Sequence, residues 1–107
     1  MKRLSAQAVA DRLKQPLDNF ILLDVRTPEE WLSDGRIDGA KLIPIDEIQE
    51  RALNELPKDS EIIAYCHVGV RSLAAARWLE QIGYQNVADL DGGIEAWIGG
   101  GLPVLRG

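Results

Sequence analysis

Cys66 is the only cysteine in this chain of 107 residues, and its neighbours favour a reactive thiol. It follows a short apolar run, residues 62–65, and precedes Gly69, Arg71 and a helical stretch that begins near Ser72. A strand, a tight loop and a helix start direct backbone N–H groups at one point, so together they can hold a thiolate or another anion. Such dipoles and a nearby cation favour the ionised form of a thiol. The pattern predicts a nucleophile, and a buried structural cysteine is the alternative.

Each neighbour of the thiol also has a plainer interpretation. Gly69 either lets the backbone close around a small atom or is an ordinary turn glycine. Arg71 either binds the anionic part of a substrate or pairs with an acidic residue such as Asp24. Ser72 is expected to cap the helix first, with its hydroxyl near the sulfur as a secondary role. His67, the only histidine, suggests a cysteine–histidine protease, but adjacent positions make the required geometry unfavourable, so we expect a residue at the rim of the site.

Composition and charge narrow the function classes. Apolar residues make up 46% of the chain and charged residues 27%, as in soluble globular domains. The net charge is −5 and lysines and arginines form no run, which disfavours nucleic-acid binding. An acidic body repels small anions at long range. An anion site must therefore depend on local donors within a Debye length, about 8–10 Å.

Metal ions, cofactors and membranes are not expected. One cysteine and one histidine are too few for a zinc site with three or four ligands, and one cysteine allows no internal disulfide. The glycines at 99–101 match neither the Walker nor the dinucleotide-binding pattern. No unbroken apolar stretch of ten residues occurs, so we expect neither a secretory segment nor a membrane span, and the cytoplasm is the default location.

Apolar periodicity predicts strands that alternate with helices. Ser5 is the expected cap of the first helix, which should end near Pro16, and Thr27, Pro28 and Glu30 form a capping box for the second. The expected helices cover residues 6–14, 46–56, 73–82 and 94–98, and a further helix opens at residues 27–30. The expected strands cover 20–23, 40–43, 62–65 and 86–90.

The order of these elements determines the fold class and the place of the site. Alternating strands and helices indicate an α/β fold with a mostly parallel sheet that is covered on both faces. Ligands of such sheets bind at the carboxyl ends of the strands, where Cys66, Asp24 and Arg26 all lie. Trp31 and Leu32 are expected to provide the buried face of the second helix, and Leu53 part of that of the third.

Four stretches together resemble the rhodanese family of sulfurtransferases, and the match extends over nearly the whole chain. The cysteine loop and the aspartate-valine-arginine segment are specific in combination. The four stretches are Leu22-Leu23-Asp24-Val25-Arg26-Thr27-Pro28-Glu29-Glu30-Trp31, Gly35-Arg36-Ile37-Asp38-Gly39-Ala40, Tyr65-Cys66-His67-Val68-Gly69-Val70-Arg71-Ser72, and Leu90-Asp91-Gly92-Gly93-Ile94-Glu95-Ala96-Trp97.

The resemblance implies a fold, a reaction and a set of roles. Residues 1–107 would form a single rhodanese-like domain, a three-layer α/β/α sandwich. Cys66 would accept a sulfane sulfur from thiosulfate or a similar donor, carry it as a persulfide and pass it to cyanide or a thiol. Arg71 would bind or orient the donor, while Asp24 and Arg26 would brace the loop from beneath. The outer sulfur would be cradled by the loop residues His67, Val68, Gly69, Val70 and Arg71 and by the Ser72 amide.

Two departures and two alternatives accompany the resemblance. Family members usually have histidine and proline where this chain has Arg36 and Asp38, which concerns the local turn rather than the sulfur chemistry. Because no second cysteine can resolve a persulfide, an external thiol or a partner protein is implied, and a relay or regulatory module is one alternative. The other is a phosphatase or arsenate reductase of related fold. Those enzymes place five residues between cysteine and arginine, but only residues 67–70 intervene here.

Overall fold

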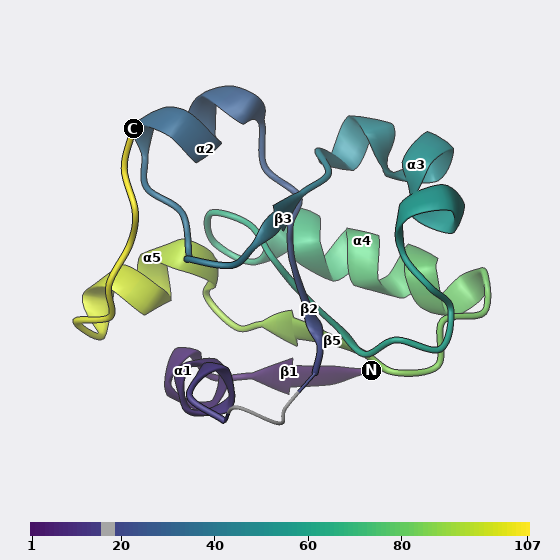
Figure 1. Cartoon of the computed structure of the whole chain (residues 1–107), viewed down its shortest axis with the longest axis horizontal. Coiled ribbons are helices and arrows are strands. Elements are labelled where there is room, and N and C mark those ends of the chain that lie inside the picture. Colours follow the sequence, from purple (N-terminus) through teal and green to yellow (C-terminus); the bar gives the residue numbers. More distant parts are fainter. Residues whose placement is uncertain (16–18) are drawn as a thin grey trace.

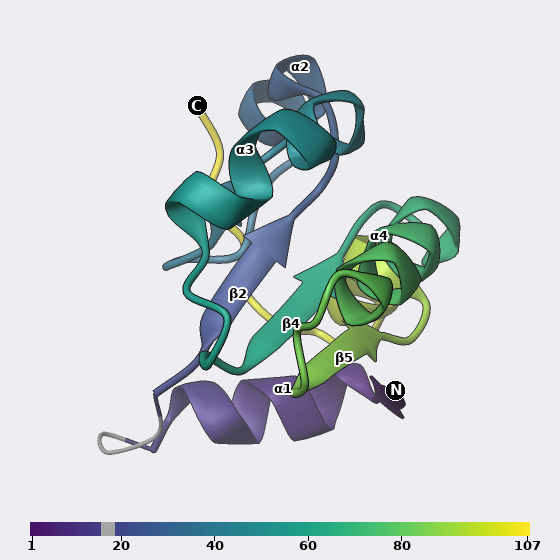
Figure 2. The same ribbon diagram turned by 90° about the vertical axis from the view of Figure 1, so that its right-hand side faces the viewer.

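In the part of the chain that the structure describes, a parallel sheet of five strands forms the centre of the molecule. The computed structural model describes residues 1–15 and 19–107. Within them the strand order is β1-β5-β4-β2-β3, and all pairs are parallel. Figure 2 shows β2, β4 and β5 side by side and pointing in one direction. The strands are β1 (Lys2–Leu4), β2 (Ile21–Asp24), β3 (Lys41–Leu42), β4 (Ile62–Tyr65) and β5 (Val87–Leu90).

In the described residues, five α-helices and one 3-10 turn follow or connect the strands and cover the sheet (Figure 1). The predicted end of the first helix near Pro16 lies outside the described residues, and its last described helical residue is Leu13. The helices are α1 (Ala6–Leu13), α2 (Pro28–Ser33), α3 (Ile48–Glu55), α4 (Val70–Gln81) and α5 (Gly93–Gly99), and the 3-10 turn η1 is Ile45–Glu47. No helix in the described part of the chain is long and apolar enough to cross a membrane.

Side chains of β4 alternate between the two faces of the sheet, as the pleat of a strand requires. Ile62 and Ala64 join a buried cluster that contains residues of α3 and α4, and Cys66 continues this row. Ile63 and Tyr65 join the opposite cluster, with residues of α1 and α5. The predicted α/β fold with a parallel sheet between two helical layers is therefore confirmed, and the thiol lies on the α4 side.

Local signals in the sequence specify the ends of several helices. The Ser5 hydroxyl accepts the N–H of Ala8 at 3.1 Å, which caps α1 as predicted. At α2, Thr27 accepts the N–H of Glu30, and the Glu30 carboxylate accepts the N–H of Thr27. This reciprocal arrangement is the predicted capping box, and it holds Glu30 at the start of α2.

The structure differs from the expected elements in several places, including the bounds of β3 and the 3-10 turn η1 before α3. The edge strand β1 was not predicted, because three residues carry no readable period of their own. Helix α4 begins at Val70 rather than Leu73, because Gly69 in a left-handed conformation starts the helix earlier. Leu53 is 61% exposed, because the buried row of α3 runs through Ile48, Ala52 and Leu56 at intervals of four residues. Leu32 of α2 is also exposed.

Candidate active site

The sulfur of Cys66 accepts hydrogen bonds from the start of α4. The N–H of Gly69 lies 3.1 Å from Sγ and the N–H of Ser72 lies 3.4 Å from it. Gly69 has φ +101°, a conformation that glycine adopts without strain, and it is the N-cap of α4. Although Cys66 is only 1% exposed, its sulfur faces polar donors. The loop therefore has the amide geometry predicted for a thiolate or a small anion.

Ser72 links the sulfur to a buried carboxylate. The Cys66 thiol donates to Ser72 Oγ at 3.4 Å, and this hydroxyl in turn donates to Asp89 at the end of β5. Ser72 and Asp89 are both fully buried. Ser72 was expected to be the helix cap, but Gly69 takes that position. The Ser72 hydroxyl therefore hydrogen-bonds to the Cys66 sulfur and to the Asp89 carboxylate instead of capping the helix.

Arg3 completes this chain of contacts from the edge of the sheet. Strand β1 pairs with β5 in a register that places Arg3 opposite Asp89. The guanidinium donates to Asp89 Oδ2 from Nε at 3.0 Å and from Nη2 at 2.8 Å, and these bonds raise the pKa of Arg3. Sequence reasoning missed both residues. No local pattern indicates them, because only the pairing of the first strand with the last brings them together.

Arg71 forms the predicted ion pair with an acidic residue, but the partner is Glu30 of α2 rather than Asp24, which the sequence offered as an example. Its two terminal nitrogens donate to the two carboxylate oxygens at 2.7 and 2.8 Å. The Arg71 hydrogen bonds are the main cause that lowers the pKa of Glu30 to about 2. The same carboxylate belongs to the capping box of α2. Arg71 is therefore held beside the cysteine loop by an acidic partner.

Asp24 and Arg26 form a fully buried ion pair after β2. Arg26 donates to both carboxylate oxygens, and its Nη2 also donates to the carbonyl of Gly35 at 2.8 Å. The guanidinium lies 5.6 Å from the centre of the Tyr65 ring, directly before Cys66. These contacts connect Asp24 and Arg26 to Gly35 and to Tyr65 at the end of β4. That the pair braces the cysteine loop stays a prediction.

Arg36, one of the two departures from the family pattern, lies against Trp31. Its guanidinium carbon is 5.2 Å from the centre of the Trp31 ring, a cation–π arrangement, and Nη1 donates to the Trp31 carbonyl at 3.3 Å. Backbone bonds between Arg36 and Leu105 add the C-terminal segment to this turn. Trp31 is only half-buried rather than buried as predicted, and the Arg36 guanidinium lies over its ring.

The start of α5 holds the back of the cysteine loop. The N–H of Ile94 donates to the Cys66 carbonyl at 2.9 Å, and the N–H of Glu95 donates to the His67 carbonyl at 3.1 Å. A Cβ at Gly93 would lie 2.4 Å from the latter carbonyl oxygen, so only glycine fits there. The loop is fixed from behind by the backbone of another helix.

His67, Val68 and Val70 form the outer side of the loop. His67 lies at the rim, where Nε2 is 3.1 Å from a Glu95 carboxylate oxygen. Val68 is 50% exposed and Val70 is 73% exposed. Solvent thus borders the loop that covers the sulfur. Among the described residues, no group of three or more histidine, cysteine, aspartate or glutamate side chains is arranged to bind a metal ion.

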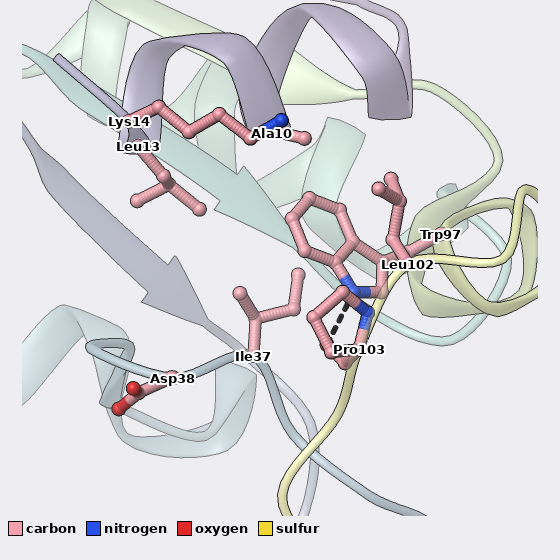
Figure 3. A pocket seen from close by; sticks show the side chains of 8 residues that line it. All are labelled: Ala10, Leu13, Lys14, Ile37, Asp38, Trp97, Leu102 and Pro103. Atoms are coloured by element: carbon pink, nitrogen blue, oxygen red, sulfur yellow. Dashed lines mark hydrogen bonds between the residues drawn. The ribbon is translucent and has the colours of Figure 1, made fainter.

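A separate apolar pocket of about 290 Å³ lies between α1, α5 and the C-terminal segment (Figure 3). Its lining includes Leu13, Ile37 and Trp97, and the Trp97 indole donates to the Pro103 carbonyl at 2.8 Å. The pocket is on the α1 and α5 side of the sheet, whereas the Cys66 side chain is on the α4 side. None of the predicted site residues lines it.

Comparison with known proteins identifies the family. The sequence model of the rhodanese-like domain family matches residues 5–99. The chain belongs to the rhodanese-like family. A sulfurtransferase of Allochromatium vinosum is 37% identical over 105 residues, which are 98% of this chain and 95% of that protein. A rhodanese-related protein of Thermoplasma volcanium has a structure with a TM-score of 0.86 and 34% identity, covering 98% of each chain.

One further relative has a different name and a different length. YrkF of Bacillus subtilis, named as a candidate sulfur carrier protein, is 37% identical over 92 residues of this rhodanese-like chain. The match covers 83% of this chain and 49% of YrkF. The family assignment supports sulfur transfer as the general activity, and the resemblance found in the sequence is confirmed.

Proposed function

We propose that this rhodanese-like protein moves a sulfane sulfur from thiosulfate or a similar donor to cyanide or a small thiol through a persulfide on Cys66. Residues 1–107 would act as one domain in this reaction. One observation carries the proposal. The sulfur receives two backbone N–H groups, from Gly69 and Ser72, at the start of α4. These donors can stabilise an anionic sulfur before and after it gains a second sulfur atom.

The reaction consists of two displacements at sulfur. The Cys66 thiolate attacks the outer sulfur of thiosulfate, a new S–S bond forms, and sulfite leaves with the electron pair of the bond that breaks. Cyanide or a thiolate then attacks the outer sulfur of the persulfide and regenerates the Cys66 thiolate. The chain has no second cysteine, so the acceptor must come from outside the chain.

Mass spectrometry of the intact protein tests the proposal. After brief treatment with thiosulfate and removal of the excess, we expect a mass gain of one sulfur atom, located on Cys66. Cyanide should remove this sulfur and release thiocyanate. Cys66→Ser is the matched control, because the hydroxyl is close in size to the thiol and cannot form a persulfide. An unmodified wild-type protein, or equal thiocyanate production by both proteins, would contradict the proposal.

The second candidate is a sulfur relay to a protein partner. It is favoured by the name of YrkF and by the exposed rim formed by Val68 and Val70 beside the thiol. The same experiment separates the two. A stable persulfide on Cys66 with negligible turnover to cyanide or small thiols would favour the relay. Rapid turnover favours the enzyme.

Phosphoryl transfer fits the site less well. The four residues between Cys66 and Arg71 form a shorter loop than the five of the related phosphatases. Hydrolysis of an aryl phosphate that depends on Cys66, without thiosulfate chemistry, would replace our proposal with the phosphatase.

A further inference from the structure

We propose that Ser72 and Asp89 act together as the proton acceptor of the Cys66 thiol, and that Arg3 holds Asp89 in position for this task. The inference deepens the proposed function, because it assigns the step that prepares the thiol for attack. Ser72 touches the reacting sulfur. Asp89 and Arg3 act through it and are positioning residues.

The directions of the hydrogen bonds carry the inference. A serine hydroxyl has a single proton, and Ser72 donates it to Asp89. The Ser72 oxygen therefore presents a lone pair to the sulfur, and the Cys66 thiol donates to that oxygen at 3.4 Å. The arrangement favours departure of the thiol proton toward Asp89, in the manner of a nucleophile beside a base.

The proton transfer conserves charge within the buried site. The proton on Sγ moves to Ser72 Oγ, the former Ser72 proton moves to Asp89 Oδ1, and the electron pair of the S–H bond stays on the sulfur. Asp89 becomes a neutral acid, and the Ser72 hydroxyl now points its proton at the thiolate. Because Cys66, Ser72 and Asp89 are all nearly or fully buried, a step without net charge change avoids the cost of creating a buried charge.

Arg3 ties Asp89 to the cysteine loop as well as to β1. Its Nε and Nη2 both bind Oδ2, which leaves Oδ1 for the Ser72 hydroxyl. Nη2 also lies 3.1 Å from the point where a Cβ on Gly69 would be, so the guanidinium packs over the loop. This division of the two carboxylate oxygens fixes the orientation of Asp89 toward Ser72.

Other charged groups lie around the site, but in the described residues none of them is hydrogen-bonded to Ser72 as Asp89 is. Asp91 lies 3.5 Å from the Arg3 guanidinium, is well exposed and shares this cation with Asp89. Two further charge pairs lie near the loop, Arg71 with Glu30 and Asp24 with Arg26, and the His67 ring contacts Glu95. Asp89 is thus the carboxylate that the hydrogen bonds join to Cys66.

Alkylation of Cys66 by iodoacetamide, a neutral reagent, tests the pair without requiring sulfur transfer. We expect the wild-type rate to persist toward low pH, because the internal transfer consumes no external base. In Asp89→Asn the rate should fall about tenfold for each pH unit below the midpoint of its own curve, as for an unassisted thiol. At pH 6 we expect the variant to be about tenfold slower or more.

Electrostatics without proton transfer makes the opposite prediction for Asp89→Asn. Removal of a negative charge near the sulfur would favour the thiolate and raise the alkylation rate. Asp91→Asn is the matched control, since it removes the same charge beside the same arginine and should keep the wild-type pH profile. A faster Asp89→Asn protein, or an unchanged profile, would overturn the inference.

A second pair of variants, at Ser72, tests the inference even if Asp89→Asn does not fold. Ser72→Ala removes the hydroxyl and should reproduce the steep profile, whereas Ser72→Thr keeps it and should restore the shallow one. In each folded variant the loss of alkylation rate should vanish at high pH, where the thiol ionises unaided. A merely structural defect would not recover in this way.

If the wild type forms a persulfide but all variants share its alkylation profile, this inference fails and the proposed function stands. If the wild type gains no sulfur, the proposed function fails alone.

Discussion

Arg71 is already paired with an acidic residue of its own chain, Glu30, in the absence of any donor. Its bidentate pair with Glu30 satisfies the guanidinium fork that a thiosulfate or sulfonate group would otherwise occupy. The resemblance to the rhodanese family predicts that Arg71 binds or orients the donor, and in that role Glu30 would compete with the substrate. The affinity for the donor would therefore depend on how much more strongly Arg71 binds the donor anion than it binds the Glu30 carboxylate.

Glu30→Gln should therefore strengthen binding of anionic donors. Glutamine also fits a capping box, so the start of α2 is retained while the charge is lost. We expect the KM for thiosulfate to fall about two- to fivefold, since a partly exposed ion pair contributes about 0.5–1 kcal/mol. Steady-state kinetics check this value. Glu29→Gln, an exposed neighbour in the same turn, is the control and should keep the wild-type KM.

At the scale of elements, the cysteine loop is held between the start of α4 and the start of α5. Helix α4 supplies the two N–H groups that reach the sulfur, and α5 binds the carbonyls on the other side of the same peptide segment. The close approach of α5 depends on Gly93, which has φ +62° and no room for a Cβ. The shape of the sulfur site is thus a property of two helices and their packing.

Gly93→Ala should displace the loop and weaken sulfur loading. The left-handed backbone alone costs an alanine about 1–3 kcal/mol, and the contact with the Cys66 and His67 carbonyls adds to this cost. We expect a lower midpoint of thermal unfolding and slower persulfide formation. Gly99→Ala at the far end of α5 is the control, because a Cβ there meets nothing within 4 Å. Equal behaviour of the two variants would contradict the role assigned to α5.

At the scale of the whole molecule, charge opposes the approach of an anionic donor. The net charge is −5, while the two arginines at the cysteine loop, Arg3 and Arg71, are both paired with carboxylates. The field that a distant thiosulfate meets is therefore set by the acidic surface, and the local donors act only at short range.

Salt should accelerate loading by thiosulfate. As ionic strength rises from 0.01 to 0.15 M, the Debye length falls from about 30 to about 8 Å and long-range repulsion weakens. We expect the second-order rate constant for persulfide formation to rise severalfold in sodium chloride. Alkylation of Cys66 by neutral iodoacetamide should not change, and this serves as the control. A rate constant that falls with salt would indicate net attraction of the donor instead.

Local features could be predicted because they depend on few neighbouring residues. The capping box at Thr27, the glycine at 69 and the apolar run before Cys66 each determine a helix end, a left-handed turn or a buried strand from within their own segment. Alternating strands and helices are then sufficient for the α/β class and for a thiol at the carboxyl end of a strand. For the same reason the family could be identified from four short stretches.

Pairings between distant segments were decided by the tertiary structure alone. Arg71 pairs with Glu30 rather than Asp24, and Arg3 reaches Asp89, because the sheet order brings β1 beside β5 and the end of β2 beside the cysteine loop. Nothing in the spacing of these residues encodes that order. The amino-acid sequence by itself predicted Cys66 as the reacting residue and identified the loop that surrounds its sulfur, since both lie within a few consecutive residues. The charged groups around the site, such as Arg3 and Asp89, lie up to 86 residues apart in the sequence. Only the folded structure brings them together.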